Sequence, residues 1–335
     1  MLFGPGILAA TDERGRAMGA RAVPPPIPGE VIDPPPKDVP DAVSKIDAKD
    51  GATSDTVGVG YRALQRFSYA NAGLLAAGTT YYLFLAMFSI IAFGYGLVAI
   101  LGADQAASTL TDALQSAFPG MVGDDGIDPQ KLKAVGRATS VVGLLALLWA
   151  GGGAMAAASA SLHQIFGATP DSRNYFKARA RLLGWMLALL PLVAVSYAAT
   201  TMVTSFAGPI LDSIGLDSTL GRTTLIVLTL MLALVVDFVI LWLILSYLGG
   251  IRPEHRARMA GALLGAVLIE VLKYFMAVIV GFSVDKPEYG ALAAPIGILL
   301  VLYLQCMAAY GAAALAAGIA ERDVPLEHLA PAASG

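Results

Sequence analysis

The stretch TTLIVLTLMLALVVDFVILWLILSY, at residues 223–247, decides the fold class, because it is a long apolar segment with one charged residue, Asp237. A bilayer-spanning α-helix needs about 20 consecutive and mostly apolar residues, whereas the helices of soluble cores are generally shorter. The segment therefore predicts a helix that crosses a membrane.

Similar apolar blocks flank this segment on both sides. Of all residues, 56% are hydrophobic and 14% are charged, whereas soluble domains carry about 25% charged residues. Short polar loops separate the blocks, which favours separate spans over one very apolar soluble bundle. We therefore predict an all-α, polytopic membrane protein with six transmembrane helices, at residues 74–101, 138–160, 181–204, 223–247, 259–284 and 290–319.

Basic residues near the span ends are distributed unequally, and six spans place both termini on one side. Ten Lys and Arg residues lie in the segments on that side: Arg62, Arg66, Arg173, Lys177, Arg179, Arg181, Arg252, Arg256, Arg258 and Arg322. Five lie in the alternate loops: Lys131, Lys133, Arg137, Arg222 and Lys286. The positive-inside rule therefore predicts that both termini are cytoplasmic.

The two ends of the chain differ from the apolar blocks. Residues 1–58 combine clustered prolines with acidic residues and glycine, and such a segment buries too little apolar surface to offset its ordering entropy. We predict a disordered, Pro-rich cytoplasmic tail at 1–58, a membrane domain at 59–320 and a short cytoplasmic tail at 321–335. The apolar run at residues 2–10 lacks a preceding basic region and contains a Gly-Pro pair, so we expect no signal peptide.

Two further helices are expected outside the spans. Tyr61, Leu64 and Phe67 fall on one helical face, which predicts a short interfacial helix leading into the membrane. In the first external loop, apolar residues spaced four apart within 106–118 predict another helix. This helix either caps the bundle or lies flat on the outer leaflet.

Three ionisable residues lie deep within predicted spans: Asp237 in the fourth, and Glu270 and Lys273 in the fifth. Each costs about 2.5–3.5 kcal/mol at a helix centre on insertion scales, so we expect them to face the bundle interior and pair. Their first interpretation is a buried ion cluster that only orients two helices. The second is a site for a substrate, ion or proton, because two carboxylates and one ammonium group leave a charge to be neutralised.

Glycines are placed where they permit close helix packing. Gly151, Gly152 and Gly153 lie in the second span, and Gly261 and Gly265 form a small-xxx-small pair in the fifth. Packing within one chain is the simplest interpretation. A homo-oligomer face or a flexible hinge is the alternative.

The order of several short motifs resembles the YihY/BrkB family of bacterial inner-membrane proteins, formerly labelled ribonuclease BN. The similar segments are Ala76-Ala77, Tyr81-Tyr82, Gly261-Ala262-Leu263-Leu264, Glu270-Val271-Leu272-Lys273 and Tyr289-Gly290. The chain departs from the family at Ala86 and Ser89, and its Gly311-Ala312-Ala313 stands where the family has Gly-Ala-Glu. The resemblance implies a multi-pass protein of the bacterial cytoplasmic (inner) membrane with a role in envelope integrity.

Enzyme signatures are not found in the sequence. His163, His255, His328 and the single cysteine, Cys306, have no metal-ligand spacing. No Walker loop or dinucleotide fingerprint is present, and neither a basic field for nucleic acid nor the aqueous metal or His site of a ribonuclease is indicated. We therefore expect no enzyme activity, cofactor, metal or nucleic-acid partner, and we reject the ribonuclease label.

Two functions remain open. The first is transport, in which the protein moves or hands over a lipid or another amphiphilic envelope component. The second is a non-transporting membrane scaffold for envelope integrity, which recruits partners through its tail. Membrane lipids are the expected partners in the first case, and a second copy of the chain or an envelope protein in the second. An intramembrane enzyme is a third and weaker hypothesis.

Overall fold

The computed structural model describes residues 52–117, 136–167, 175–201, 219–251, 253–275 and 293–321, with a few isolated positions between them. All regular elements in these ranges are helices, which confirms the all-α class. They are α2 (Ala52–Tyr69), α3 (Ala72–Leu101), α4 (Asp104–Ala117), α6 (Arg137–Phe166), α7 (Tyr175–Thr201), α9 (Thr219–Leu243), the π-helical turn η2 (Ile244–Leu248), α10 (His255–Tyr274) and α12 (Ala293–Ala320).

Five of the described helices are long and apolar enough to cross a membrane. They lie at Ala72–Leu101, Ser140–Phe166, Phe176–Tyr197, Val227–Leu248 and Pro295–Ala320, and they correspond to five of the six predicted spans. The helix in the remaining position, α10, ends at Tyr274, and the rest of that span lies outside the described residues. A multi-pass membrane protein is thus supported, while the count of six and the orientation of the termini stay predictions.

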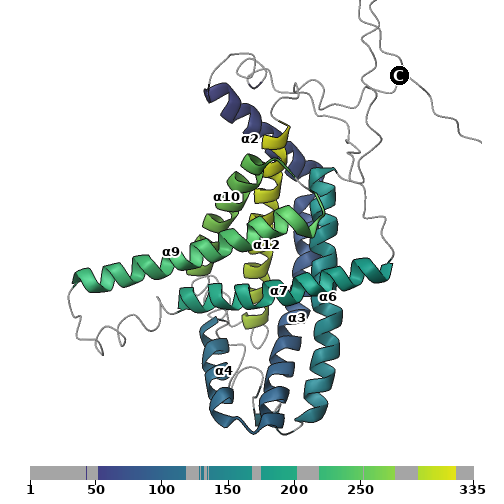
Figure 1. The fold of residues 1–335 in the computed structure, drawn as a ribbon, viewed down its shortest axis with the longest axis vertical. Coiled ribbons are helices and arrows are strands. Elements are labelled where there is room, and N and C mark those ends of the chain that lie inside the picture. Colours follow the sequence, from purple (N-terminus) through teal and green to yellow (C-terminus); the bar gives the residue numbers. More distant parts are fainter. Residues whose placement is uncertain are drawn as a thin grey trace, which may run out of the picture.

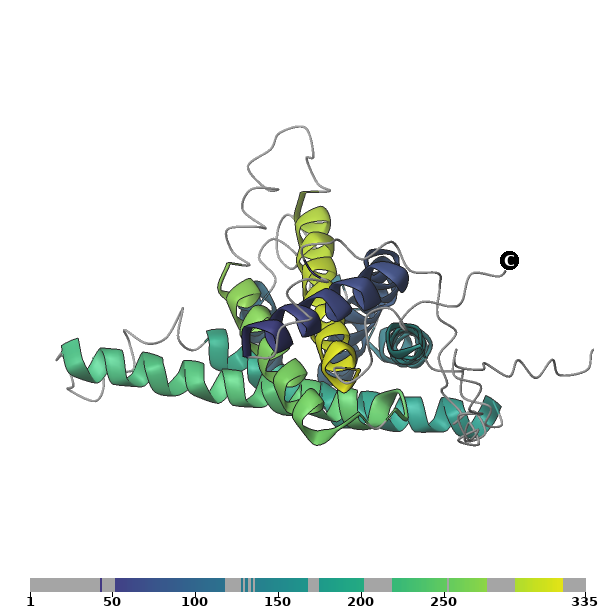
Figure 2. The same ribbon diagram turned by 90° about the horizontal axis from the view of Figure 1, so that it is seen from above.

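The helices run in two main directions (Figure 1). In that view α3, α6 and α12 stand upright, and α7 and α9 lie across them. The view from above shows the same crossing, with α6 seen end-on and α7 and α9 seen along their length (Figure 2). α7 and α9 also pack against each other, and α10 packs against both α9 and α12. The chain is therefore not a simple parallel bundle.

Among the described helices the most extensive contact joins α3 and α6, because glycines allow their backbones to approach closely. A Cβ atom at Gly96 would lie 2.4 Å from the backbone nitrogen of Ser140, and one at Gly143 would lie 2.5 Å from that of Phe93. Both distances are too short for any side chain, so glycine is required at each position. Neither residue was among those that sequence analysis assigned to packing.

The five glycines that were assigned to packing lie at contacts between helices of one chain. Gly151 and Gly152 face α7, where added Cβ atoms would meet Met186 and Arg179, and Gly153 faces Tyr82 of α3. On α10, Gly261 and Gly265 face α12, and their added Cβ atoms would meet Ala312 at 2.6 and 2.8 Å. This placement fits the interpretation of packing within the chain.

Helix α2 begins at Ala52, so residues 52–58, which we assigned to the disordered tail, are helical. Asp55 lies in the first turn, where a carboxylate favours helix formation by interacting with the helix dipole. The preceding residues lie outside the described ranges, apart from one isolated position. The boundary between the tail and the helical domain is therefore closer to residue 52 than to residue 58.

A helix, α2, is present where we predicted an interfacial one, and its packed face carries two arginines as well as Phe67. Arg62 and Arg66 are buried, whereas Leu64 is 62% exposed. Arg66 Nε donates to Glu321 Oε2 at 3.0 Å, and its Nη2 atom pairs with Oε1 of the same carboxylate. A two-point contact between guanidinium and carboxylate has favourable geometry. It attaches α2 to the end of α12.

The helix predicted within 106–118 is present as α4 and packs against the other helices. Leu110 and Leu114 of α4 pack against a small core cluster that includes Ile91 and Tyr95 of α3. The Tyr95 hydroxyl also lies 2.6 Å from Thr111 Oγ1. These contacts favour the capping interpretation over a helix that lies separately on the leaflet.

The predicted topology can be tested with fusion reporters. If six helices span the membrane, reporters placed after residue 58, in the 161–180 and 248–258 segments, and after residue 320 should all report the cytoplasm. A reporter within 118–127 should report the opposite side. Alkaline phosphatase and green fluorescent protein fusions measure the two outcomes independently. A periplasmic signal at one terminus alone would contradict an even number of spans.

Candidate functional site: a buried ion cluster

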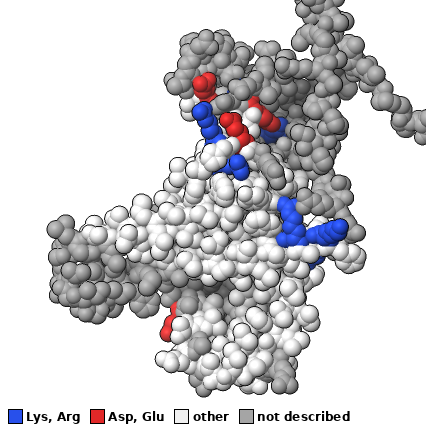
Figure 3. All heavy atoms as spheres, in the orientation of Figure 1, with Lys and Arg blue, Asp and Glu red and all other residues white. Residues whose placement is uncertain are grey.

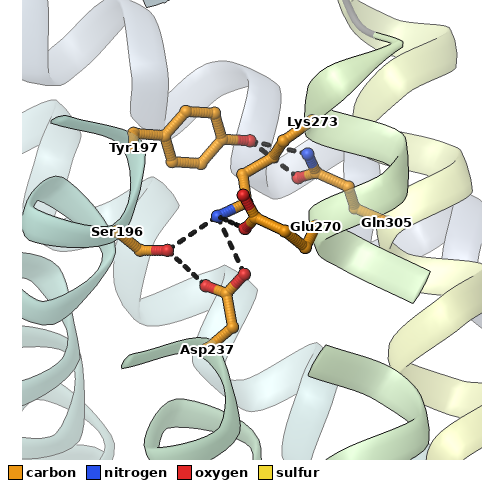
Figure 4. A network of polar contacts seen from close by, with 6 residues as sticks. All are labelled: Ser196, Tyr197, Asp237, Glu270, Lys273 and Gln305. Atoms are coloured by element: carbon orange, nitrogen blue, oxygen red, sulfur yellow. Dashed lines mark hydrogen bonds and ion pairs between the residues drawn. The ribbon is translucent and has the colours of Figure 1, made fainter. Parts of the chain in front are cut away.

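The structure brings Asp237, Glu270 and Lys273 into direct contact (Figure 4). Lys273 Nζ lies 2.8 Å from Asp237 Oδ2 and 2.6 Å from Glu270 Oε2. Lys273 and Asp237 are each only 5% exposed. Because Asp237 comes from α9 and the other two from α10, the ammonium group connects two helices through two carboxylates.

A serine completes the environment of the lysine. Ser196 of α7, which is 1% exposed, accepts a hydrogen bond from Lys273 Nζ at 2.7 Å. Its hydroxyl in turn donates to Asp237 Oδ1. The lysine thus has oxygen partners from three helices, namely one ion pair with each carboxylate and one hydrogen bond to Ser196.

A tyrosine and a glutamine extend this polar region towards α12. Tyr197 follows Ser196 on α7, and Lys273 Nζ lies 5.6 Å from the centroid of its ring. This distance permits a cation–π attraction. The Tyr197 hydroxyl lies 2.9 Å from Gln305 Oε1 and 2.7 Å from Gln305 Nε2. Figure 4 shows the glutamine reaching from α12 towards the tyrosine, so four helices contribute to the site.

The arrangement of α7 and α9 explains how these residues meet. Arg181, near the beginning of α7, donates to the carbonyl groups of Tyr247 and Leu248 in the π-helical turn. Further along the same pair of helices, Ser196 bonds to Asp237. The two connections fix one helix against the other. A π-helical turn often marks a functional site, because it disturbs the regular hydrogen bonding of a helix.

Counted over the described residues and with each group ionised, the cluster has one more acidic than basic side chain. Two carboxylates surround one ammonium group, and burying an ion without full compensation is costly in an apolar interior. A proton, a cation or the basic headgroup of a lipid would balance the remaining charge. In chemical terms the cluster is thus equipped to hold a positively charged group.

Sequence analysis did not predict three members of the site. Ser196 and Tyr197 are common residue types in membrane helices and gave no signal by themselves. Gln305 is an amide within an otherwise apolar span, and this feature could have identified it. Among the described residues no group of three or more His, Cys, Asp or Glu side chains has the arrangement of a metal site.

Outside the ion cluster, charged side chains gather in a few patches on the surface (Figure 3). On the face shown, they gather where α2, α10 and α12 meet and beside the crossing of α6 and α7, and one acidic side chain lies at α4. Most of the remaining described surface on this face carries no charge. Large apolar side chains are exposed there and elsewhere, including Leu228 and Leu232 of α9, as expected where lipid is the solvent.

Comparison with protein families decides the classification of the chain. The family model described as "Virulence factor BrkB" matches residues 63–334. The chain belongs to the BrkB family. The BrkB match begins within α2 and includes all the following described helices, and therefore every residue of the ion cluster. No curated protein and no solved structure gives a significant match.

Proposed function

We propose that this BrkB-family protein acts in transport, and that it moves or hands over a lipid or another amphiphilic envelope component. The observation that carries the proposal is the burial of Lys273 between Asp237 and Glu270, with Ser196 as a third partner. Ionisable residues inside membrane helices commonly mark the pathways of substrates, ions or protons. In this proposal the cluster is the working site.

The number of carboxylates supports a role beyond packing. One carboxylate would neutralise Lys273, and the second adds a charge that makes the cluster more costly to bury. A purely structural joint gains little from this addition. A site that alternately holds and releases a positively charged group needs the second carboxylate. The ammonium group of Lys273 can then stay paired with one carboxylate while the other carboxylate binds the incoming group.

The exposed apolar faces of the crossing helices support an amphiphilic cargo. Leu187 of α7 is 62% exposed and Leu228 of α9 is 66% exposed, so both helices offer apolar surface to acyl chains. A lipid with its chains on such a surface would need only a short polar path for its headgroup. The cluster provides polar groups at the contact between these same two helices and α10.

Movement of fluorescent phospholipids in liposomes tests the proposal. We expect the wild-type protein to move labelled lipid between leaflets faster than protein-free liposomes. The triple variant Asp237→Asn, Glu270→Gln, Lys273→Met should fall to the protein-free rate, because no ionic group remains in the site. Reduction of the label by dithionite measures the lipid in the outer leaflet.

The matched control is Asp112→Asn, which removes an exposed carboxylate on α4 and should leave the rate unchanged. Equal rates with and without the wild-type protein would contradict the transport proposal. If, in addition, cells that carry the triple variant keep their envelope integrity, the result would favour the scaffold hypothesis, in which the charges serve packing alone.

A further inference from the structure

The groups around Lys273 Nζ are those that recognise an organic ammonium ion. The atom lies 2.8 Å from Asp237 Oδ2 and 2.6 Å from Glu270 Oε2. It donates to Ser196 Oγ at 2.7 Å and lies 5.6 Å from the centroid of the Tyr197 ring. Carboxylates attract the charge, oxygen atoms accept from the N–H groups, and an aromatic face attracts the cation as a whole. The protein has thus built an ammonium site and placed its own lysine in it.

The lysine leaves part of this site unused. Asp237 Oδ2 is buried and, among the described residues, accepts no hydrogen bond, although Lys273 Nζ lies close enough for an ion pair. Buried oxygen atoms in proteins usually accept at least one hydrogen bond. Ser196 holds the lysine at Asp237, because its hydroxyl accepts from Nζ and donates to Asp237 Oδ1 (Figure 4). Lys273 can therefore stay at Asp237 while Glu270 takes another partner.

Glu270 is the more accessible of the two carboxylates. Its side chain is 13% exposed, compared with 6% for Asp237 and 1% for Lys273. Tyr274 lies one turn further along α10, on the same face of the helix, and is 61% exposed. Val271, next to Glu270, is 49% exposed. A lipid could place its chains on this apolar surface while its headgroup reaches Glu270.

The chemistry of the site favours a primary ammonium group over other headgroups. A primary ammonium carries three N–H donors, as Lys273 does, and can donate to the carboxylate oxygens. A quaternary ammonium has the same charge but no N–H donor. A headgroup with a net negative charge would be repelled by the two carboxylates. Lys273 is in this respect an internal mimic of the group that the site would bind.

We propose that the ion cluster binds lipids with a primary ammonium headgroup, that Glu270 receives this group, and that Asp237 and Ser196 retain Lys273. The proposal rests on the transport function proposed above and names the class of lipid. No covalent bond changes, because Glu270 exchanges one ammonium partner for another. The incoming ammonium balances the second carboxylate, so the cluster is neutral while the group is bound.

Chemical rescue of Lys273→Ala tests the ammonium site without any transport. The variant removes the internal ammonium and leaves space for a small one. At a hundredfold excess over its dissociation constant, ethylammonium should raise the melting temperature in detergent by about 5–10 °C. Tetramethylammonium and sodium at the same ionic strength should not. A folded variant that ethylammonium does not stabilise would overturn the proposal.

The matched control for rescue is Lys131→Ala, which removes a lysine whose side chain is 85% exposed. None of the three cations should change its melting temperature relative to the wild-type protein. Sodium that stabilises Lys273→Ala as strongly as ethylammonium does would show a site for any small cation, and would overturn recognition of the ammonium group.

Headgroup preference in liposomes tests the proposal with the wild-type protein. Phospholipids labelled on an acyl chain should move at least about tenfold faster with an ethanolamine headgroup than with a choline or glycerol headgroup. A site built on hydrogen bonds rejects an analogue that lacks the donors. Glu270→Gln, which keeps Lys273 paired with Asp237, should lose this preference.

The two experiments separate this proposal from the transport function. If the wild-type protein moves all three lipids at equal rates, headgroup recognition is overturned and the transport function stands. If no lipid moves but ethylammonium stabilises Lys273→Ala, transport is overturned and the ammonium site is supported. Rescue by ethylammonium together with faster movement of the ethanolamine lipid supports both.

Discussion

Replacing Lys273 with Met is expected to lower the free energy of unfolding by about 3–5 kcal/mol, because removing one partner of a buried ion pair leaves its counter-charge uncompensated. Here two carboxylates would remain, those of Asp237 and Glu270. The variant should therefore melt at a markedly lower temperature in detergent than the wild-type protein.

Further changes at the same site should reverse most of this loss. The double variant Lys273→Met, Glu270→Gln leaves only Asp237 charged, with Ser196 as its hydrogen-bond donor, and should recover part of the stability. Adding Asp237→Asn removes the last buried charge and should recover most of the remainder. Melting curves of the three variants measure this series. A single Lys273→Met variant as stable as the wild type would show that the cluster does not form.

Replacing Gly143 with Leu is expected to separate α3 from α6. A Cβ atom at this position would already lie 2.5 Å from the backbone nitrogen of Phe93, and backbone cannot move aside as a flexible side chain can. Even Gly96→Ala, which places one methyl group against Ser140, should cost about 1–3 kcal/mol through overpacking. The leucine variant should fail to give a folded, monodisperse protein in detergent chromatography.

Gly78 provides the matched control, since it lies in the same helix α3 and a Cβ atom there would meet nothing within 4 Å. Gly78→Ala should be neutral or stabilise the protein by up to about 1 kcal/mol, because alanine favours the helix more than glycine does. Equal effects at Gly78 and Gly96 would show that the cost comes from the helix itself and not from the contact between α3 and α6.

The sequence predicted the features that depend on composition along a single segment. Apolar length identified five helices that the structure also describes as long enough to span a membrane. The isolated charges of Asp237, Glu270 and Lys273 indicated mutual pairing, since each is costly alone in an apolar span. Their contact follows from this cost, together with the short connection between the two helices that carry them.

Features that depend on how helices meet could not be predicted in this way. The crossing of α7 and α9 over the other helices leaves no periodic signal, because these helices are apolar on most faces. Ser196 acquires its place in the cluster only through that crossing. Similarly, the packed face of α2 was assigned to its apolar residues, whereas Glu321 at the distant end of α12 compensates the buried Arg66.

The pairing of Arg66 with Glu321 also sets an order of events during synthesis. The two residues are 255 positions apart in the chain. At about 5–20 residues per second, the ribosome delivers Glu321 roughly 10–50 s after Arg66. Throughout that interval α2 has been made but its ion pair with Glu321 has not formed. The contact between α2 and the end of α12 therefore forms only after the last described helix has been made.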